Sequence, residues 1–87
     1  MLQEYVGQAV VIDLRSPFVC LGTLRGVDET WLELRNADLH DVRDTQTSRE
    51  NYVAESQATG IKRNRKRVLV VRGDVVAVSL LEDVVNE

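Results

Sequence analysis

The sequence has one cysteine, one proline and one tryptophan, and aromatic residues make up only 5% of its 87 residues. A single cysteine excludes an intrachain disulfide, a composition typical of proteins from reducing compartments. So small an aromatic content argues against an extended platform on which nucleic-acid bases could stack. Any aromatic contact with a ligand must therefore come from one or two side chains.

The chain also has no long hydrophobic run. No apolar segment approaches the roughly 18–20 residues that a membrane-spanning helix requires. The start of the chain, residues 1–5, has no basic segment followed by an apolar core, so we expect no signal peptide and a cytoplasmic protein without a membrane partner. The formal net charge of −3 argues against a wholly basic nucleic-acid-binding surface but allows a local basic patch.

The 44% apolar and 29% charged residues are ordinary for a folded protein, and we expect one domain over residues 1–87. Short apolar segments predict five strands, at residues 9–15, 18–27, 31–35, 68–71 and 75–80. In the first strand, Val10 and Ile12 are predicted to face the core and Val11 the solvent. Gly22 and Gly26 interrupt the second strand, where glycine typically marks a bulge or a sharp bend.

Arg72-Gly73-Asp74 separates the last two predicted strands. Gly73 is expected to supply the positive φ or close backbone approach of a tight turn. Both flanking strands are apolar on both faces, more than the core of a small domain can cover. We therefore expect a homo-oligomer, because an exposed apolar edge invites pairing with another chain. Its predicted interface residues are Val68, Val70, Val76 and Val78.

The long connection at about residues 36–67 is expected to contain structure of its own. Thr47 and Glu50 have the spacing of a capping box, and Gly60 follows as a stop signal. These signals predict a surface helix over residues 48–59, packed through Tyr52 and Val53. Such a helix is also a possible docking element for a protein partner.

Two groups of residues resemble the motifs of the Sm and Sm-like (LSm) family. The first group is Gly7, Val10, Leu14, Gly22-Thr23-Leu24, Asp28, Leu32 and Leu34, and the second is the segment 70–76 around Arg72-Gly73. The resemblance implies a mainly β fold, a strongly bent five-stranded SH3-like barrel, here with one helix inserted between strands three and four. It also implies rings in which strand four of one subunit pairs with strand five of the next, and single-stranded RNA as a partner.

In the family, RNA binds where the turn after strand two meets the Arg-Gly turn before strand five. The resemblance therefore makes Asp28, Trp31, Arg72 and Gly73 candidate RNA-binding residues. The turn Asp28-Glu29-Thr30-Trp31 is one residue shorter than the family pattern, and no asparagine follows the stacking position. Since that asparagine reads the uracil edge, we expect RNA binding without strict uridine selectivity.

Each candidate also has a structural interpretation. Trp31 could stack on a base or pack within the protein, and Arg72 could bind a base or a phosphate, or pair with Asp28 or Asp74. The segment 62–67 is strongly basic, which makes Lys62, Arg63 and Arg65 candidates for phosphate contacts. Alternatively, Arg63, Arg65 and Arg67 could be paired by acidic residues across the connection, namely Asp38, Asp41 and Asp44.

No pattern in the sequence predicts a catalytic or metal site. Asp38, His40, Asp41 and Asp44 do not match the spacing of a known metal site, and a Cys20–His40 pair has no third group to activate it. We therefore expect no enzyme and no cofactor. The first hypothesis is a ring-forming RNA-binding protein; the alternative is a homo-oligomeric interaction or scaffold module without a nucleic-acid role.

Overall fold

The computed structural model describes residues 1–44 and 48–85. Its elements, in chain order, are η1 (Leu2–Tyr5), β1 (Ala9–Leu14), β2 (Phe18–Val27), β3 (Trp31–Asp41), η2 (Val42–Asp44), α1 (Arg49–Thr59), β4 (Arg65–Val71), η3 (Arg72–Asp74), β5 (Val75–Leu80) and η4 (Leu81–Asp83). The predicted five strands and inserted helix are thus confirmed. In the described ranges, no helix is both long and apolar enough to cross a membrane.

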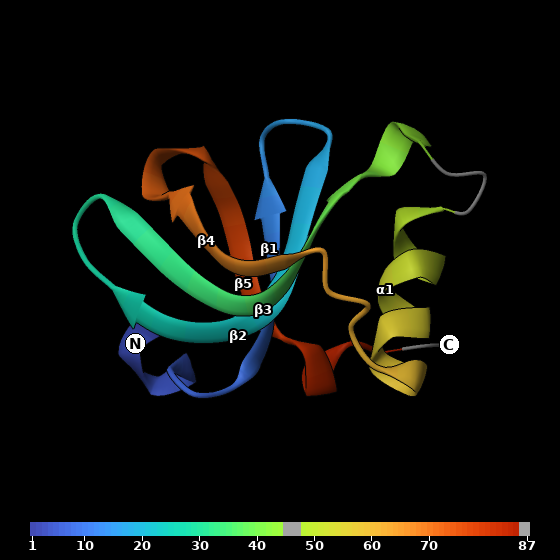
Figure 1. Cartoon of the computed structure of the whole chain (residues 1–87), viewed down its shortest axis with the longest axis horizontal. Coiled ribbons are helices and arrows are strands. Elements are labelled where there is room, and N and C mark those ends of the chain that lie inside the picture. Colours follow the sequence, from blue (N-terminus) through green and yellow to red (C-terminus); the bar gives the residue numbers. More distant parts are fainter. Residues whose placement is uncertain (45–47, 86–87) are drawn as a thin grey trace.

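The five strands form one antiparallel sheet in the order β4-β3-β2-β1-β5. β4 and β5 are therefore the two edges, yet only η3 separates them in the chain. Four residues span at most about 14 Å, so the two edges must approach each other where η3 joins them. This connection requires the strong curvature seen in Figure 1. The described strands form an open sheet rather than a fully closed barrel.

The bend of β2 depends on Gly22. A Cβ atom at this position would lie 2.9 Å from the Cβ of Ala37, so only glycine lets β3 approach this closely. The β2–β3 pairing shifts register between Leu21 and Thr23 and again between Leu24 and Gly26. The predicted role of glycine in bending the second strand is therefore confirmed at Gly22.

β3 is longer than predicted, because it continues to Asp41 instead of ending near Arg35. Asn36 has a positive φ of 50° and interrupts the ladder between Arg35 and Ala37. Beyond it, Leu39 and His40 still pair with β2. The polar residues between Ala37 and Asp41 have weak strand propensity, so the sequence did not predict this extension. Pairing with β2 overrides that weak propensity in the folded protein.

The main core lies on the inner face of the curved sheet. Its buried residues are Val10, Ile12, Cys20, Leu24, Leu32, Leu34, Ala37 and Val70. Val70 is only 7% exposed, so its side chain belongs to the core of the protomer. The sequence predicted Val70 as an interface residue, because a continuous apolar run does not reveal which side chains face the core of the protomer.

A second core lies beneath α1. Val11, Val19 and Leu21 project from the other face of β1 and β2, where they pack with Val53 of α1 and Leu81 of η4. Tyr52 is partly buried in the same cluster, so packing of the helix through Tyr52 and Val53 is confirmed. The prediction that Val11 faces solvent is wrong, because α1 covers that face of the sheet.

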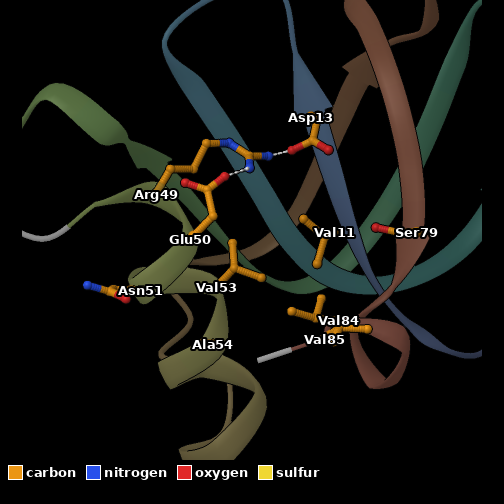
Figure 2. Close-up of a pocket in the computed structure, with 10 residues that line it drawn as sticks. All are labelled: Val11, Asp13, Arg49, Glu50, Asn51, Val53, Ala54, Ser79, Val84 and Val85. Carbon is orange, nitrogen blue, oxygen red and sulfur yellow. Dashed lines mark ion pairs between the residues drawn. The ribbon is translucent and has the colours of Figure 1, made fainter. Parts of the chain in front are cut away.

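The predicted helix begins with a different cap. The Ser48 Oγ accepts a hydrogen bond from the Asn51 backbone N–H at 3.2 Å, whereas Thr47, in the predicted capping box, lies outside the described residues. At the other end, Gly60 has a φ of 96° and donates its N–H to the Ser56 carbonyl, which confirms its role as the stop. Figure 2 shows Arg49 of α1 reaching across to form an ion pair with Asp13 of β1.

Candidate nucleic-acid interface

The turn between β2 and β3 is organised by Asp28. Its Oδ1 accepts hydrogen bonds from the backbone N–H groups of Thr30 and Trp31, both at 2.7 Å. The Asp28 N–H donates to the Trp31 carbonyl in return, at 3.0 Å. These bonds lower the pKa of the Asp28 carboxyl below its ordinary value, the Trp31 N–H contributing most. Asp28 therefore holds the turn in shape at neutral pH.

Arg72 of η3 is bound to this same turn. Its guanidinium Nη1 donates to the Asp28 carbonyl oxygen at 2.7 Å, and its backbone N–H donates to the Thr30 carbonyl at 2.7 Å. The Arg72 side chain is exposed and makes no ion pair within residues 1–44 and 48–85. Arg72 therefore binds Asp28 through the backbone carbonyl rather than the carboxylate, and it shapes the turn as the structural interpretation predicted.

Gly73 follows Arg72 in η3, but the backbone there does not need a glycine as predicted. Its φ is not positive, and a Cβ atom there would meet no atom within 4 Å. The expected conformational need for glycine is therefore wrong at this position. What remains is a small, exposed residue that leaves the surface next to Arg72 open.

Trp31 is 42% exposed and lines a shallow cavity of about 270 Å³ on the outer face of the sheet. The cavity is also lined by Gly26, Val27, Asp28, Glu33, Arg67 and Leu69. Because so much of the indole reaches solvent, Trp31 is available for stacking as well as for packing. Two of the RNA-binding candidates, Asp28 and Trp31, thus line the same cavity.

Glu33 and Arg67 also line this cavity, and the sequence did not indicate either as a binding residue. The Glu33 Oε2 accepts from Arg67 Nε at 2.7 Å and from Arg35 Nε at 3.0 Å. These bonds lower the pKa of the Glu33 carboxyl, the bond from Arg67 contributing most. The alternation of Trp31, Glu33 and Arg35 along one strand indicates that Glu33 lies on the same face as Trp31. The position of Arg67 beside Glu33 depends instead on the pairing of β3 with β4.

No protein-family model matches the chain, and no curated protein matches it. Among solved structures, an Sm protein from Pyrococcus abyssii in complex with a uridine heptamer is 16% identical, with a TM-score of 0.62, and the match covers 91% of this chain and 90% of that one. The chain has the Sm fold.

Two further Sm structures agree. An Sm-like protein from Archaeoglobus fulgidus is 18% identical with a TM-score of 0.61, and the match covers 92% of this chain and 88% of that one. A heptameric archaeal Sm protein is 23% identical with a TM-score of 0.61, over 91% of this chain and 93% of that one. The resemblance seen in the sequence is therefore confirmed as a resemblance of fold.

The basic segment of this Sm-fold chain lies away from Arg72. β4 begins at Arg65 and ends at Val71, so Arg65 and Arg72 are separated by roughly 20 Å of strand. Figure 1 shows the start of β4 on the side of α1 and η3 at the far end. The candidates therefore form two regions, with Arg67 lying between them on β4.

The alternative in which Arg63, Arg65 and Arg67 pair with Asp38, Asp41 and Asp44 is not what the described residues show. Arg67 binds Glu33, Arg63 Nη1 donates to the Asn36 Oδ1 at 2.6 Å, and Arg65 Nη1 donates to the Asn64 carbonyl at 3.0 Å. Across the described ranges, Lys62, Arg63, Arg65 and Lys66 make no ion pair and are exposed. Their charge is available to an anionic partner.

The acidic residues have other roles. Asp38 is 7% exposed and its Oδ2 accepts a hydrogen bond from the Tyr52 hydroxyl. His40 stacks on the Tyr52 ring at a centroid distance of 4.0 Å, and Asp41 forms an ion pair with Arg43 at 2.8 Å. The described residues contain no cluster of three His, Cys, Asp or Glu side chains placed to bind a metal.

Cys20 is fully buried in the main core. Burial raises the pKa of its thiol to about 12, and the nearby Asp38 adds to this effect. A thiol with so high a pKa is a small hydrophobic side chain at neutral pH rather than a nucleophile.

The predicted interface residues differ in exposure. Val76 on β5 is 64% exposed, whereas Val68 and Val78 are partly buried against the main core. On β4, Leu69 and Val71 are the exposed apolar residues, and the interface prediction did not include them. Apolar side chains thus project outward from both edge strands.

Proposed function

We propose that this protein assembles into an Sm-like ring and binds single-stranded RNA at the ring surface without strict uridine selectivity. The observation that carries the RNA proposal is the pair of hydrogen bonds from Arg72 to the Asp28–Trp31 turn. They hold an exposed guanidinium and an exposed indole on adjacent turns, at the two positions that the Sm resemblance assigns to RNA.

Ring formation is supported by the two open edges of the sheet. Among residues 1–44 and 48–85, β4 and β5 each pair with one neighbouring strand, so each presents unpaired backbone groups along its outer side. Val71 and Val76 expose apolar side chains on these same strands. Pairing β4 of one copy with β5 of the next would satisfy the backbone groups and cover the apolar side chains, the usual remedy for an exposed edge. The heptameric archaeal Sm protein offers a model for such a closed arrangement.

RNA binding is supported by two kinds of contact. Trp31 offers a ring for stacking, worth roughly 1–3 kcal/mol per base, and Arg72 can add a cation–π or phosphate contact. The exposed Lys62, Arg63 and Arg65 would add sequence-independent attraction to the phosphate backbone. A strand that follows β4 could contact both regions. The Pyrococcus abyssii structure contains a uridine heptamer, which makes short oligonucleotides suitable probes.

The absence of an asparagine after Trp31 supports binding without strict uridine selectivity. Sm-type uracil recognition uses that amide to read the base edge, whereas stacking alone accepts every base. The residue that follows Trp31 is Leu32, whose side chain is buried in the main core. No side chain at that position can therefore perform the amide's role.

Fluorescence-anisotropy titrations with oligo-U, oligo-A and a matched DNA at two salt concentrations would test RNA binding, and light scattering would measure the assembly. We expect a closed homo-oligomer whose affinity for RNA falls as salt rises. A homo-oligomer that binds no oligonucleotide at low salt would leave the scaffold alternative standing. A stable monomer at micromolar concentration would contradict ring formation. The exposed side of α1 is polar, including Glu50, Asn51 and Glu55, so a protein partner docked on that side would make mainly polar contacts.

A further inference from the structure

The shallow cavity that Trp31, Glu33 and Arg67 line lies over Gly26 and is called the hollow below. We propose that it is a base pocket in which Glu33 selects a nucleobase carrying an exocyclic amino group over uracil. This inference rests on the proposed RNA binding and deepens it, because it names the class of base and the residue that reads it. The proposed function by itself requires no preference among bases.

The hollow exists because one position in the outer face of the sheet has no side chain. Gly26 pairs with Glu33, which pairs in turn with Leu69, so the three residues form one row across β2, β3 and β4. A Cβ atom on Gly26 would find only one neighbour, the Glu33 Oε1 at 4.0 Å. Trp31 and Arg67 complete the walls.

The size of the cavity suits a single ring system. Its volume of about 270 Å³ is below the roughly 300–1,000 Å³ of typical small-molecule sites. A whole cofactor is therefore too large, whereas one base that leaves its ribose and phosphate in solvent can enter. The half-exposed indole of Trp31 supplies an aromatic wall for it.

Glu33 presents one oxygen to the protein and the other to the hollow. Its Oε2 accepts from both Arg35 and Arg67. Its Oε1 makes no hydrogen bond with the described part of the chain and faces Gly26. The two arginines lower the pKa of the carboxyl, so at neutral pH this oxygen is an acceptor that requires a donor.

The Glu33 Oε1 requires a hydrogen-bond donor, and the four bases differ in the donors that they offer. Adenine, cytosine and guanine each carry an exocyclic amino group, which donates hydrogen bonds, and carboxylates are known to accept from such groups. Uracil has carbonyl oxygens in place of exocyclic amines and only one ring N–H donor on its pairing edge. Uracil can reach Oε1 only through this N3–H, which has a carbonyl oxygen on each side. Binding it therefore brings an acceptor oxygen close to the carboxylate, and this repulsion weakens the binding of uracil relative to the other bases.

Titrations of the full-length protein with oligo-A, oligo-C and oligo-U of equal length would test this. Since a hydrogen bond to a charged group is worth roughly 1.5 kcal/mol or more, we expect oligo-A and oligo-C to bind about tenfold more tightly than oligo-U. Glu33→Gln should bring the three affinities to within about twofold, because an amide can both donate and accept. Glu29→Gln, which removes an equal charge from the same turn outside the pocket, should leave the ratio unchanged.

Gly26→Val gives a second, independent test. The φ of Gly26 is not positive and the space above it is open, so valine fits the strand and fills the hollow. We expect this variant to lose the preference while retaining salt-dependent RNA binding, and it keeps the proposal testable if Glu33→Gln does not fold. Light scattering on each variant would confirm that the assembly is unchanged.

Two results would separate the failure of this inference from the failure of the proposed function. Salt-dependent binding with equal affinities for the three oligonucleotides, or a ratio unchanged in both Glu33→Gln and Gly26→Val, would overturn base selection and leave RNA binding standing. No binding of any oligonucleotide by the unmodified protein at low salt would overturn both.

Discussion

Arg72 donates from its guanidinium to the Asp28 carbonyl oxygen at 2.7 Å, although 44 positions separate the two residues in the chain. The bond joins the turn between the two edge strands to the turn between β2 and β3. Bonding to a carbonyl leaves the Asp28 carboxylate free to accept from Thr30 and Trp31. The two turns therefore form one surface whose shape depends on both residues.

Removal of the Arg72 side chain should weaken RNA binding locally. Arg72→Ala is expected to cost roughly 1–3 kcal/mol of binding free energy, because the variant cannot make the stacking or cation–π interaction with a base. Arg72→Lys should recover only part of this, since an ammonium keeps the charge but not the planar group. Anisotropy titrations would measure both variants, with Arg43→Ala as a control that removes an equal charge at η2. Equal losses in Arg72→Ala and Arg43→Ala would show that only net charge matters.

The basic segment should act through charge alone. Lys62→Gln and Arg63→Gln are expected to weaken binding to every oligonucleotide alike. For a single strand, each phosphate that a variant no longer neutralises should reduce the slope of log K against log salt by about 0.7. Titrations at four salt concentrations would give the slope. A change that differs between oligo-A and oligo-U would instead indicate a base contact at this segment.

The assembly should depend on exposed residues of the edge strands. Val76→Asp is expected to dissociate the oligomer while each protomer remains folded, because Val76 is 64% exposed in the protomer. Val70→Asp should instead unfold the protomer, since an unpaired buried carboxylate costs several kcal/mol. Light scattering and circular dichroism together distinguish the two effects. An intact oligomer in Val76→Asp would place this side chain outside the interface.

The start of α1 should depend on Ser48. Ser48→Ala is expected to reduce the free energy of unfolding by about 1 kcal/mol, because the Asn51 N–H loses its side-chain acceptor. Ser48→Asp, another favourable N-cap residue, should retain most of the stability. Urea unfolding would measure both variants. Equal stability of Ser48→Ala and the unmodified protein would show that the cap contributes nothing.

Acid should destabilise the protein through Asp28 and Asp41. The Arg43 side chain and backbone N–H lower the pKa of Asp41 from 3.8 to about 2, and backbone N–H groups lower that of Asp28. A carboxyl with a lowered pKa in the folded state adds stability that is present above its unfolded pKa and lost as pH falls through the folded value. We therefore expect the melting temperature to fall between about pH 4 and pH 2.

The double variant Asp28→Asn and Asp41→Asn should show a smaller decrease over this pH range. Glu82→Gln, which removes an exposed carboxylate from η4, is the control and should behave like the unmodified protein. NMR titration of the carboxyl carbons would test the same point directly. A carboxyl of Asp41 that titrates near 3.8 would contradict the bond to Arg43 in solution.

The sequence by itself determined the elements whose signals are local. Apolar residues placed all five strands, Gly60 ended α1 where predicted, and the combination of Gly22 with Arg72-Gly73 indicated the Sm fold. The same resemblance predicted that Asp28, Trp31 and Arg72 lie close together, and the hydrogen bonds from Arg72 to the Asp28–Trp31 turn show that the two turns adjoin. These inferences need only a residue and its near neighbours, because turn geometry, capping and strand periodicity are decided over a few residues.

Only the tertiary structure decided what depends on the partner of a residue. β3 continues beyond Asn36 because its later residues pair with β2. Val11 is buried because α1 covers its face of the sheet. Glu33 reached Arg67, 34 positions away in the chain, because β3 and β4 lie side by side on the same face. Burial and ion pairing are set by which surfaces meet after the chain folds, and the residue pattern along a single strand does not record that choice.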